Sequence, residues 1–175
     1  MALLFTLDPE LTPELRSEIV DLWTAVSNAG GAVGFVPPVT PELVRPTADR
    51  QFAGVTEGPD RLLVGREPGG GQRLAAVVFF EDQRFQLMTH WRLLKRVMVA
   101  VDAQGRGYGR ELLAQAELLA REWGLSGLRL TLRGGQGLED FYARSGYKEV
   151  GRVPGAIRTA PGVEHDDVTM WLELR

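Results

Sequence analysis

The chain has 175 residues, of which 44% are hydrophobic and 25% are charged, and its formal net charge is −3. These values predict one globular domain over residues 1–175, and the acidic balance argues against a nucleic-acid partner, which needs a basic surplus. Without cysteine there can be no disulfide or thiol nucleophile, and with two histidines we expect no metal site. No stretch is long enough to span a membrane, and the N-terminus has no basic lead, so we expect a cytoplasmic protein with no membrane partner.

Residue pairs that contain proline mark the boundaries of the first predicted elements. Residues 3–7 form a short apolar run ended by Asp8-Pro9, which predicts an opening strand. Thr12-Pro13 places an N-cap residue before a proline, and apolar residues follow at helical spacing as far as Val26. The first helix is therefore expected to end near Gly30-Gly31.

A second helix is expected after an irregular apolar loop at residues 31–38. Thr40-Pro41 repeats the pattern of the first helix start. Pro46 predicts that this helix is kinked or restarts there, because proline removes a backbone hydrogen bond.

The rest of the chain alternates between apolar runs and helical patterns. Three strands are expected at residues 61–66, 73–81 and 90–101, the first two joined by a turn at Gly69–Gly71. An amphipathic helix before Gly124, a strand at 128–132, a short helix at 137–145 and strands at 147–153 and 168–174 complete the chain. The order is β-α-α-β-β-β-α-β-α-β-β, which predicts an α/β fold with a mixed sheet flanked by helices.

The most informative segment is the glycine-rich turn between the third of these strands and the long helix. Gly105, Gly107 and Gly109 keep side chains away, so backbone N–H groups can converge on an anion at the helix N-terminus. Arg106 and Arg110 add full positive charges. The segment is therefore predicted to bind a diphosphate, although a plain strand-to-helix turn would show the same glycines.

Two well-known phosphate motifs do not fit this turn. The third glycine comes too early for G-x-G-x-x-G, and no Gly-Lys-Ser/Thr follows as in a P-loop. The pattern that fits is Gln/Arg-x-x-Gly-x-Gly/Ala, present as Gln104-Gly-Arg-Gly-Tyr-Gly109. It resembles the coenzyme A signature of the GCN5-related N-acetyltransferase (GNAT) superfamily. Phe141-Tyr-Ala-Arg-Ser-Gly-Tyr147 resembles that superfamily's F-Y-x-x-x-G-F/Y segment, in the expected order and separation.

Within the superfamily, the chain from about Leu22 onward resembles the tabtoxin-resistance type of acetyltransferase. The segments that carry this likeness are Gly31–Phe35, Met98-Val99, Phe141-Tyr142, Val153–Gly155 and His165. The resemblance implies acetylation of an amine on an amino-acid-like toxin or antibiotic, and hence a role in antibiotic resistance.

The resemblance also implies a set of site residues. The backbone of Met98–Ala100 would pair with the pantetheine arm of acetyl-CoA, and an N–H near Val99 would polarise the thioester carbonyl. Tyr142 would be the general acid that protonates the leaving thiolate, although it could equally pack beneath the sheet beside Phe141. The residues expected at the cofactor are Met98, Val99, Ala100, Gln104, Gly105, Arg106, Gly107, Tyr108, Gly109, Arg110 and Tyr142.

The sequence does not single out one residue as the general base. Relatives of the toxin-resistance type tend to carry an acidic residue on the fifth strand, where this chain has Thr131. His165, Asp166 and Asp167 are the clustered alternatives, and imidazole suits proton abstraction near neutral pH. They are expected in a loop after Val153–Gly155, which could be merely solvated. Water could also carry the proton away from the acceptor.

The acceptor is expected to be a small-molecule amine bound near residues 31–38. Phe35, Trp23 and Trp91 are potential wall residues, although such aromatics more often belong to the core. Glu42 and Asp49 could attract a cationic amine, although solvated helix charges are the more ordinary interpretation.

Three other functions fit parts of the pattern. The protein could acetylate a protein N-terminus or lysine, it could bind acyl-CoA without catalysis, or the turn could bind a nucleotide. Dimers are common in the superfamily, so a homodimer is one option that the resemblance implies.

Overall fold

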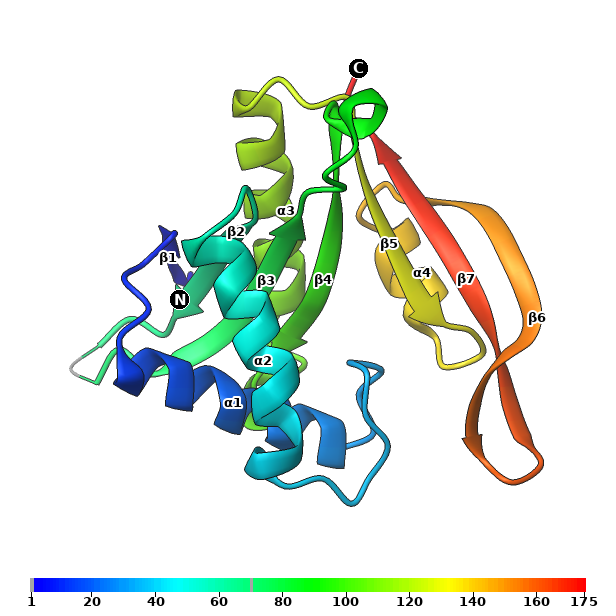
Figure 1. The fold of residues 1–175 in the computed structure, drawn as a ribbon, viewed down its shortest axis with the longest axis horizontal. Coiled ribbons are helices and arrows are strands. Elements are labelled where there is room, and N and C mark those ends of the chain that lie inside the picture. Colours follow the sequence, from blue (N-terminus) through cyan, green and yellow to red (C-terminus); the bar gives the residue numbers. More distant parts are fainter. Residues whose placement is uncertain (1, 70) are drawn as a thin grey trace. The chain divides into compact units, whose positions relative to one another are not determined.

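The computed structural model describes residues 2–69 and 71–175. Met1 of the expected domain and Gly70 of the expected Gly69–Gly71 turn therefore lie outside the described residues. The elements follow the predicted order (Figure 1). They are β1 Leu4–Leu7, α1 Pro13–Asn28, α2 Pro41–Thr56, β2 Arg61–Arg66, β3 Leu74–Glu81, β4 Trp91–Val99, α3 Tyr108–Glu122, β5 Gly127–Arg133, α4 Leu138–Ala143, β6 Lys148–Ala160 and β7 Val163–Glu173.

The strands are hydrogen-bonded in the order β1-β2-β3-β4-β5-β7-β6, which confirms the predicted α/β fold with a mixed sheet. β4 and β5 are parallel, whereas β1-β2, β2-β3, β5-β7 and β6-β7 are antiparallel. The chain divides into two compact units, the first comprising Met1–Asp82 and Leu94–Ala116 and the second Gln83–Leu93 and Glu117–Arg175. β4 and α3 each contribute residues to both units.

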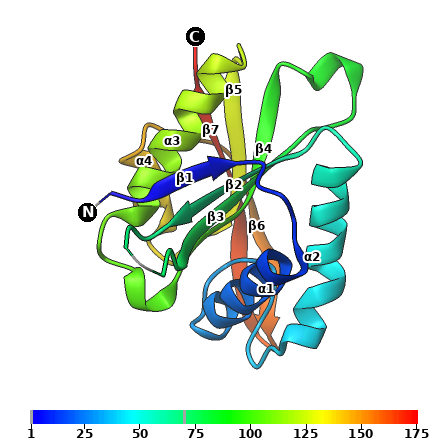
Figure 2. The same cartoon turned by 90° about the vertical axis from the view of Figure 1, so that its left-hand side faces the viewer.

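The first unit is built around β3. Every residue from Leu74 to Phe80 is buried, as expected for a strand covered on both faces. α1 and α2 lie side by side, α1 against β3 and α2 against β2 (Figure 2). Apolar side chains from both helices, among them Ile19, Trp23 and Phe52, are fully buried in this core.

The two helix starts were predicted correctly, and of the two outcomes expected at Pro46, a kink or a restart, the restart does not occur. The Thr12 hydroxyl oxygen accepts a hydrogen bond from the Leu15 N–H at 3.3 Å and so caps α1. α2 runs unbroken through Pro46, so the restart predicted there is wrong. Burial of Val44, Ala48 and Phe52 along one side of α2 offsets the backbone hydrogen bond that the proline removes.

The second unit contains a long hairpin of β6 and β7. The sequence predicted that the first of these strands ends at Val153 and is followed by a loop, but β6 continues to Ala160. The hairpin closes through Pro161-Gly162, where Gly162 has a φ of +74°. Pro154 is tolerated because the register shifts between Val153 and Ile157, where its missing N–H is not needed.

Among the described residues, no helix is both long enough and apolar enough to cross a membrane.

Candidate active site

The glycine-rich turn connects the end of β4 to α3 in the first unit. Gly105 and Gly107 have φ values of +80° and +90°, in the left-handed region that side chains disfavour. A Cβ atom added at either glycine would meet nothing within 4 Å. The backbone of the turn is therefore bare on its outer side, where a ligand could approach it closely.

The turn also supplies the N-terminal amides of α3. The N–H groups of Arg110 and Glu111 both donate to the Gly107 carbonyl, at 3.0 and 3.1 Å. The amides of Tyr108 and Gly109 therefore precede the first hydrogen bond of the helix, where N–H groups and the helix dipole favour an anion. This geometry is compatible with a diphosphate site, which stays a prediction.

At the end of β4, the backbone of Ala100 makes hydrogen bonds within the protein. The Ala100 N–H donates to the Ala75 carbonyl at 2.8 Å, and the Ala100 carbonyl accepts from the Ala103 N–H at 2.9 Å. The Ala100 N–H is therefore already bonded within the first unit, whereas its carbonyl has a second lone pair, and the pairing of Ala100 with a pantetheine arm stays a prediction. Backbone groups alternate along a strand, so Val99 directs its N–H away from β3 and Met98 does not.

Gln104 reinforces this arrangement. Its side-chain Nε2 donates to the Val99 carbonyl at 3.2 Å. The Val99 carbonyl is thus held by the turn, and the Val99 N–H is the group of the Met98–Ala100 segment best suited to a ligand.

A network of ion pairs fastens the β2-β3 hairpin to the turn. Glu67 accepts hydrogen bonds from Arg73 Nε at 2.9 Å, Arg106 Nη1 at 3.1 Å and the Tyr108 hydroxyl at 3.4 Å. Arg73 Nη1 donates to both carboxylate oxygens of Asp102, each at 2.8 Å. The Arg73 guanidinium lowers the pKa values of Glu67 and Asp102. Both carboxylates therefore stay charged, and Glu67 holds the side chain of Arg106, which is itself part of the turn.

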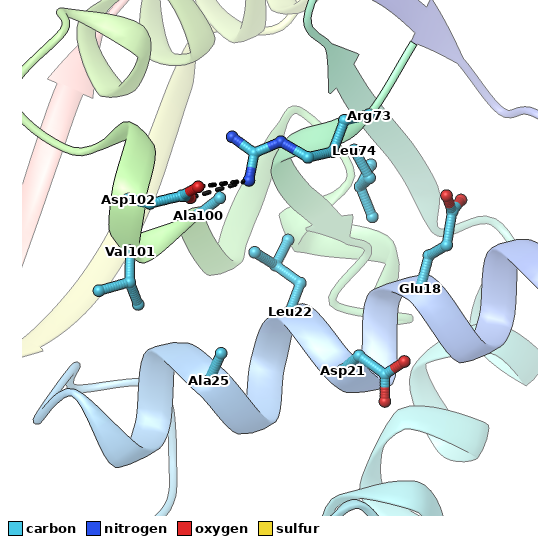
Figure 3. Close-up of a pocket in the computed structure, with 9 residues that line it drawn as sticks. All are labelled: Glu18, Asp21, Leu22, Ala25, Arg73, Leu74, Ala100, Val101 and Asp102. Atoms are coloured by element: carbon cyan, nitrogen blue, oxygen red, sulfur yellow. Dashed lines mark hydrogen bonds and ion pairs between the residues drawn. The ribbon is translucent and has the colours of Figure 1, made fainter. Parts of the chain in front are cut away.

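A pocket of about 470 Å³ adjoins this network (Figure 3). α1 contributes one wall, and Arg73 and the segment after β4, joined by the Arg73–Asp102 pair, lie across from it. Its lining is Glu18, Asp21, Leu22, Ala25, Arg73, Leu74, Ala100, Val101 and Asp102. Three carboxylates against one arginine make the pocket a poor site for a diphosphate, so the turn remains the better anion site.

The expected acid, Tyr142, lies on α4 in the second unit. Its ring makes edge contacts with Phe141 and Tyr147, at centroid distances of 5.0 and 5.8 Å. Burial raises the pKa of the Tyr142 phenol, which keeps it protonated at neutral pH.

The residues considered as bases are not in a loop, contrary to expectation. His165, Asp166 and Asp167 all lie on β7, because the β6-β7 pairing extends to Ala160 and Val163. His165 Nε2 is 3.2 Å from the Thr159 hydroxyl.

Asp166 is committed to a structural network in the same hairpin. It forms an ion pair with Arg152 at 2.8 Å and accepts a hydrogen bond from the Gly155 N–H at 3.1 Å. The Arg152 side chain lowers the pKa of the Asp166 carboxylate, which makes Asp166 a weaker base. Asp166 is therefore the weaker candidate of the two for proton transfer.

The loop at residues 31–38 is fastened at both ends to α1. The Asn28 side chain exchanges two hydrogen bonds of 2.8 Å with the backbone of Val39, and Trp23 Nε1 donates to the Val33 carbonyl at 2.8 Å. Phe35 packs edge-on against Trp23, at 5.9 Å.

Two of the aromatic residues that the sequence suggested as walls of the acceptor site, Trp23 and Trp91, are buried. Trp23 has no exposed surface, so it supports the loop from behind. Trp91 belongs to the core of the second unit, where it packs against Trp171 at 6.0 Å. Glu42 and Asp49 are exposed on α2, as in their ordinary interpretation.

The sequence did not indicate three residues of this region, which are Glu67, Arg73 and Arg96. The first two lie far along the chain from the turn that they hold, so no local pattern indicates them. Arg96 lies within the strand that was expected at residues 90–101. Its guanidinium lies 4.7 Å from the centre of the Trp23 ring, and desolvation lowers its pKa.

A family model of the acetyltransferase (GNAT) domain matches residues 60–149, which include β4, the glycine-rich turn, α3 and Tyr142. The chain belongs to the GNAT acetyltransferase family. As a GNAT protein it is an acetyl-CoA-dependent N-acetyltransferase. The glycine-rich turn at Gln104–Gly109 lies within the matched residues.

Solved structures share the whole GNAT fold with this chain. A candidate phosphinothricin N-acetyltransferase is 21% identical, with a TM-score of 0.81, and the match covers 98% of this chain and 99% of that one. The candidate acetyltransferase yncA from Salmonella typhimurium, solved with its cofactor acetyl-CoA, is 18% identical, with a TM-score of 0.74 and coverage of 100% and 95%. A ribosomal-protein-alanine N-acetyltransferase from Brucella melitensis is 20% identical, with a TM-score of 0.73 and coverage of 98% and 99%.

Proposed function

We propose that this GNAT protein transfers acetyl directly from acetyl-CoA to the primary amine of a small molecule. The observation that carries the proposal is the bare turn at Gly105 and Gly107, which opens α3 immediately after β4. When bound, acetyl-CoA supplies an activated thioester, and the protein's own residues bind it, orient it and move protons.

The turn would hold the diphosphate of acetyl-CoA. Amides of Gly105 to Gly109 would donate to it, helped by the positive end of the α3 dipole. Arg110 is exposed beside these amides and Arg106 is held nearby by Glu67. The Val99 N–H, directed away from β3, would donate to the thioester carbonyl and stabilise the charge that develops on its oxygen.

Tyr142 is proposed as the general acid. Its buried phenol keeps its proton, and the same dry surroundings would raise the pKa of a departing thiolate as well. A neutral donor beside a basic thiolate suits proton transfer as the carbon–sulfur bond breaks. The ring contacts with Phe141 and Tyr147 would set the direction of the hydroxyl.

His165 is proposed as the base that receives the proton of the acceptor amine. The contact between its Nε2 and the Thr159 hydroxyl would orient the imidazole ring. Proton transfer to water is the alternative route, and it requires no side chain.

A small, amino-acid-like acceptor is favoured over a protein for a physical reason. The loop at residues 31–38, proposed to border the acceptor, is short and is fastened by Asn28 and Trp23. A fixed loop suits a small ligand in a formed site better than an extended chain. An antibiotic or toxin of this type, and hence a resistance role in the cytoplasm, belongs to the same proposal.

We also propose that residues 1–175 act as one GNAT domain. β4 and α3 each run through both compact units, so neither unit contains a complete set of elements.

The proposal is tested by calorimetry with acetyl-CoA followed by an acceptor screen. We expect acetyl-CoA to bind, ATP not to compete, and small amines to release free thiol faster than peptides with a free N-terminus or lysine. Faster acetylation of peptides would support the protein-acetyltransferase alternative. Binding without turnover across both panels would instead support an acyl-CoA-binding module.

A further inference from the structure

Arg96 has an unusual backbone for a residue inside a strand. Its φ is +57°, in the left-handed region, although it lies within β4 and is not a glycine. Such a conformation costs free energy and persists only where the surroundings enforce it, often at functional sites.

The side chain of Arg96 is also incompletely satisfied. Its Nε is buried and has no hydrogen-bond partner among residues 2–69 and 71–175. A guanidinium carries five N–H donors, and burying a cation without hydrogen bonds is unfavourable. The Trp23 ring, 4.7 Å away, compensates in part through a cation–π contact.

Glu81, the acidic residue that acts on Arg96, does not supply a hydrogen-bond partner for the Arg96 Nε. Glu81 acts on Arg96 electrostatically, and its Oε2 accepts a hydrogen bond from Gln51 Nε2 at 3.4 Å. Arg96 therefore does not form a complete ion pair among the described residues, and its unsatisfied donor is suited to an oxyanion from a ligand.

The surface above Arg96 is the loop proposed to border the acceptor. Gly34 is exposed, with a φ of +100°, and a Cβ atom added there would lie 2.7 Å from Arg96 Nη1. A glycine at this position therefore leaves room for the guanidinium to reach the loop. Phe35, next in the chain, is half-buried against Trp23.

From this geometry we propose that Arg96 binds an oxyanion of the acceptor, so that the substrate is an amine that also carries a carboxylate, phosphinate or phosphonate. The planar guanidinium matches such groups with paired N–H donors. This inference rests on the proposed function, since it assigns the acceptor class of the same site.

Arg96 lies on the same strand as Val99. Val99 follows three residues later, and a strand rises by about 3.3 Å per residue, so the Cα atoms of the two residues lie at most about 10 Å apart, and the Arg96 side chain extends from the first of these. In this proposal Arg96 is a specificity residue and takes no part in proton transfer.

The test compares amines that differ only in the oxyanion. 4-Aminobutyrate is paired with butylamine, and 3-aminopropylphosphonate with propylamine, in steady-state assays of the full chain. Arg129→Gln is the matched control, because Arg129 also has a buried Nε without a partner and lies 5.8 Å from a tryptophan ring, that of Trp91. Since charge-assisted hydrogen bonds are lost, Arg96→Gln should raise KM for the anionic member about 10- to 100-fold and leave the neutral member nearly unchanged.

Arg96→Lys keeps the charge without the paired donors and should retain part of the preference. The inference is overturned if the wild type acetylates both members of each pair equally well, or if Arg96→Gln keeps the preference for the anionic member. A preference for the carboxylate pair alone, or for the phosphonate pair alone, identifies which oxyanion the site takes.

A second measurement does not depend on turnover. Propylphosphonate is added with coenzyme A at saturation, so that the diphosphate site is already filled. We expect the melting temperature to rise for the wild type and Arg129→Gln and to stay constant for Arg96→Gln. An equal rise in all three proteins, or no rise in any, contradicts the role of Arg96. Absence of acetyl-CoA binding would instead count against the proposed function.

Discussion

At the scale of single residues, the candidate site depends on which polar groups remain available after folding. Ala100 was expected at the cofactor, yet its N–H and carbonyl are both bonded within the first unit. Asp166 was considered as a base, yet Arg152 holds it as a charged structural partner. Val99, His165 and Tyr142 are the residues proposed for catalysis.

Tyr142→Phe tests the proposed acid. The variant removes the hydroxyl and keeps the ring that packs against Phe141 and Tyr147, so folding should be preserved. Because positioned acids contribute about 10²-fold or more, we expect kcat to fall by about that factor with little change in KM for acetyl-CoA. Thiol release under saturating acetyl-CoA measures it.

Tyr147→Phe is the control for that experiment. It removes a neighbouring hydroxyl that is buried and has no hydrogen-bond partner among the described residues. Its kcat should stay close to that of the wild type. An unchanged kcat in Tyr142→Phe would show that Tyr142 serves packing alone.

At the scale of elements, the site is a strand, a turn and a helix in direct succession. β4 ends at Val99, the turn keeps two glycines in the left-handed region, and α3 opens on free amides. Local sterics favour this arrangement, which is why it could be predicted from the glycines and the amphipathic helix. The β2-β3 hairpin then adds Glu67 and Arg73, which hold the turn from outside it.

Gly107→Ala tests the turn. The added methyl group would project into the space assigned to the diphosphate and would strain the backbone at a φ of +90°. We expect the Kd for acetyl-CoA, measured by calorimetry, to rise about tenfold or more, which corresponds to ~1.4 kcal/mol.

Gly162→Ala separates the two effects. Gly162 also has a positive φ, +74°, and open space around it, but it lies in the β6-β7 turn. Both variants should lose about 1–2 kcal/mol of unfolding free energy from backbone strain. Acetyl-CoA affinity should fall only in Gly107→Ala, and an equal affinity in the two variants would exclude the turn as the binding site.

At the scale of the whole molecule, the continuity of β4 and α3 through both units predicts cooperative unfolding. Neither unit can lose its share of these elements without disrupting the other's secondary structure. Calorimetric melting should therefore give one transition for the full chain.

Acetyl-CoA should raise that melting temperature. At 100 times its Kd, a ligand that binds only the folded protein adds ~2.7 kcal/mol of stability. For a chain of this size, that predicts a rise of about 5–10 °C. Two separate transitions would argue against a single domain, and a constant midpoint would argue against acetyl-CoA binding.

Residues close together in the sequence account for most of what could be predicted. The element order, the two threonine-proline helix starts and the glycine-rich turn follow from backbone sterics and apolar periodicity, which act over a few residues. The extension of β6, the hydrogen bonds of Ala100, the Glu67 network and the placement of Arg96 beneath Gly34 could not be predicted in this way. Each depends on strand register or on packing between segments far apart in the chain, and these are established only when the chain has folded.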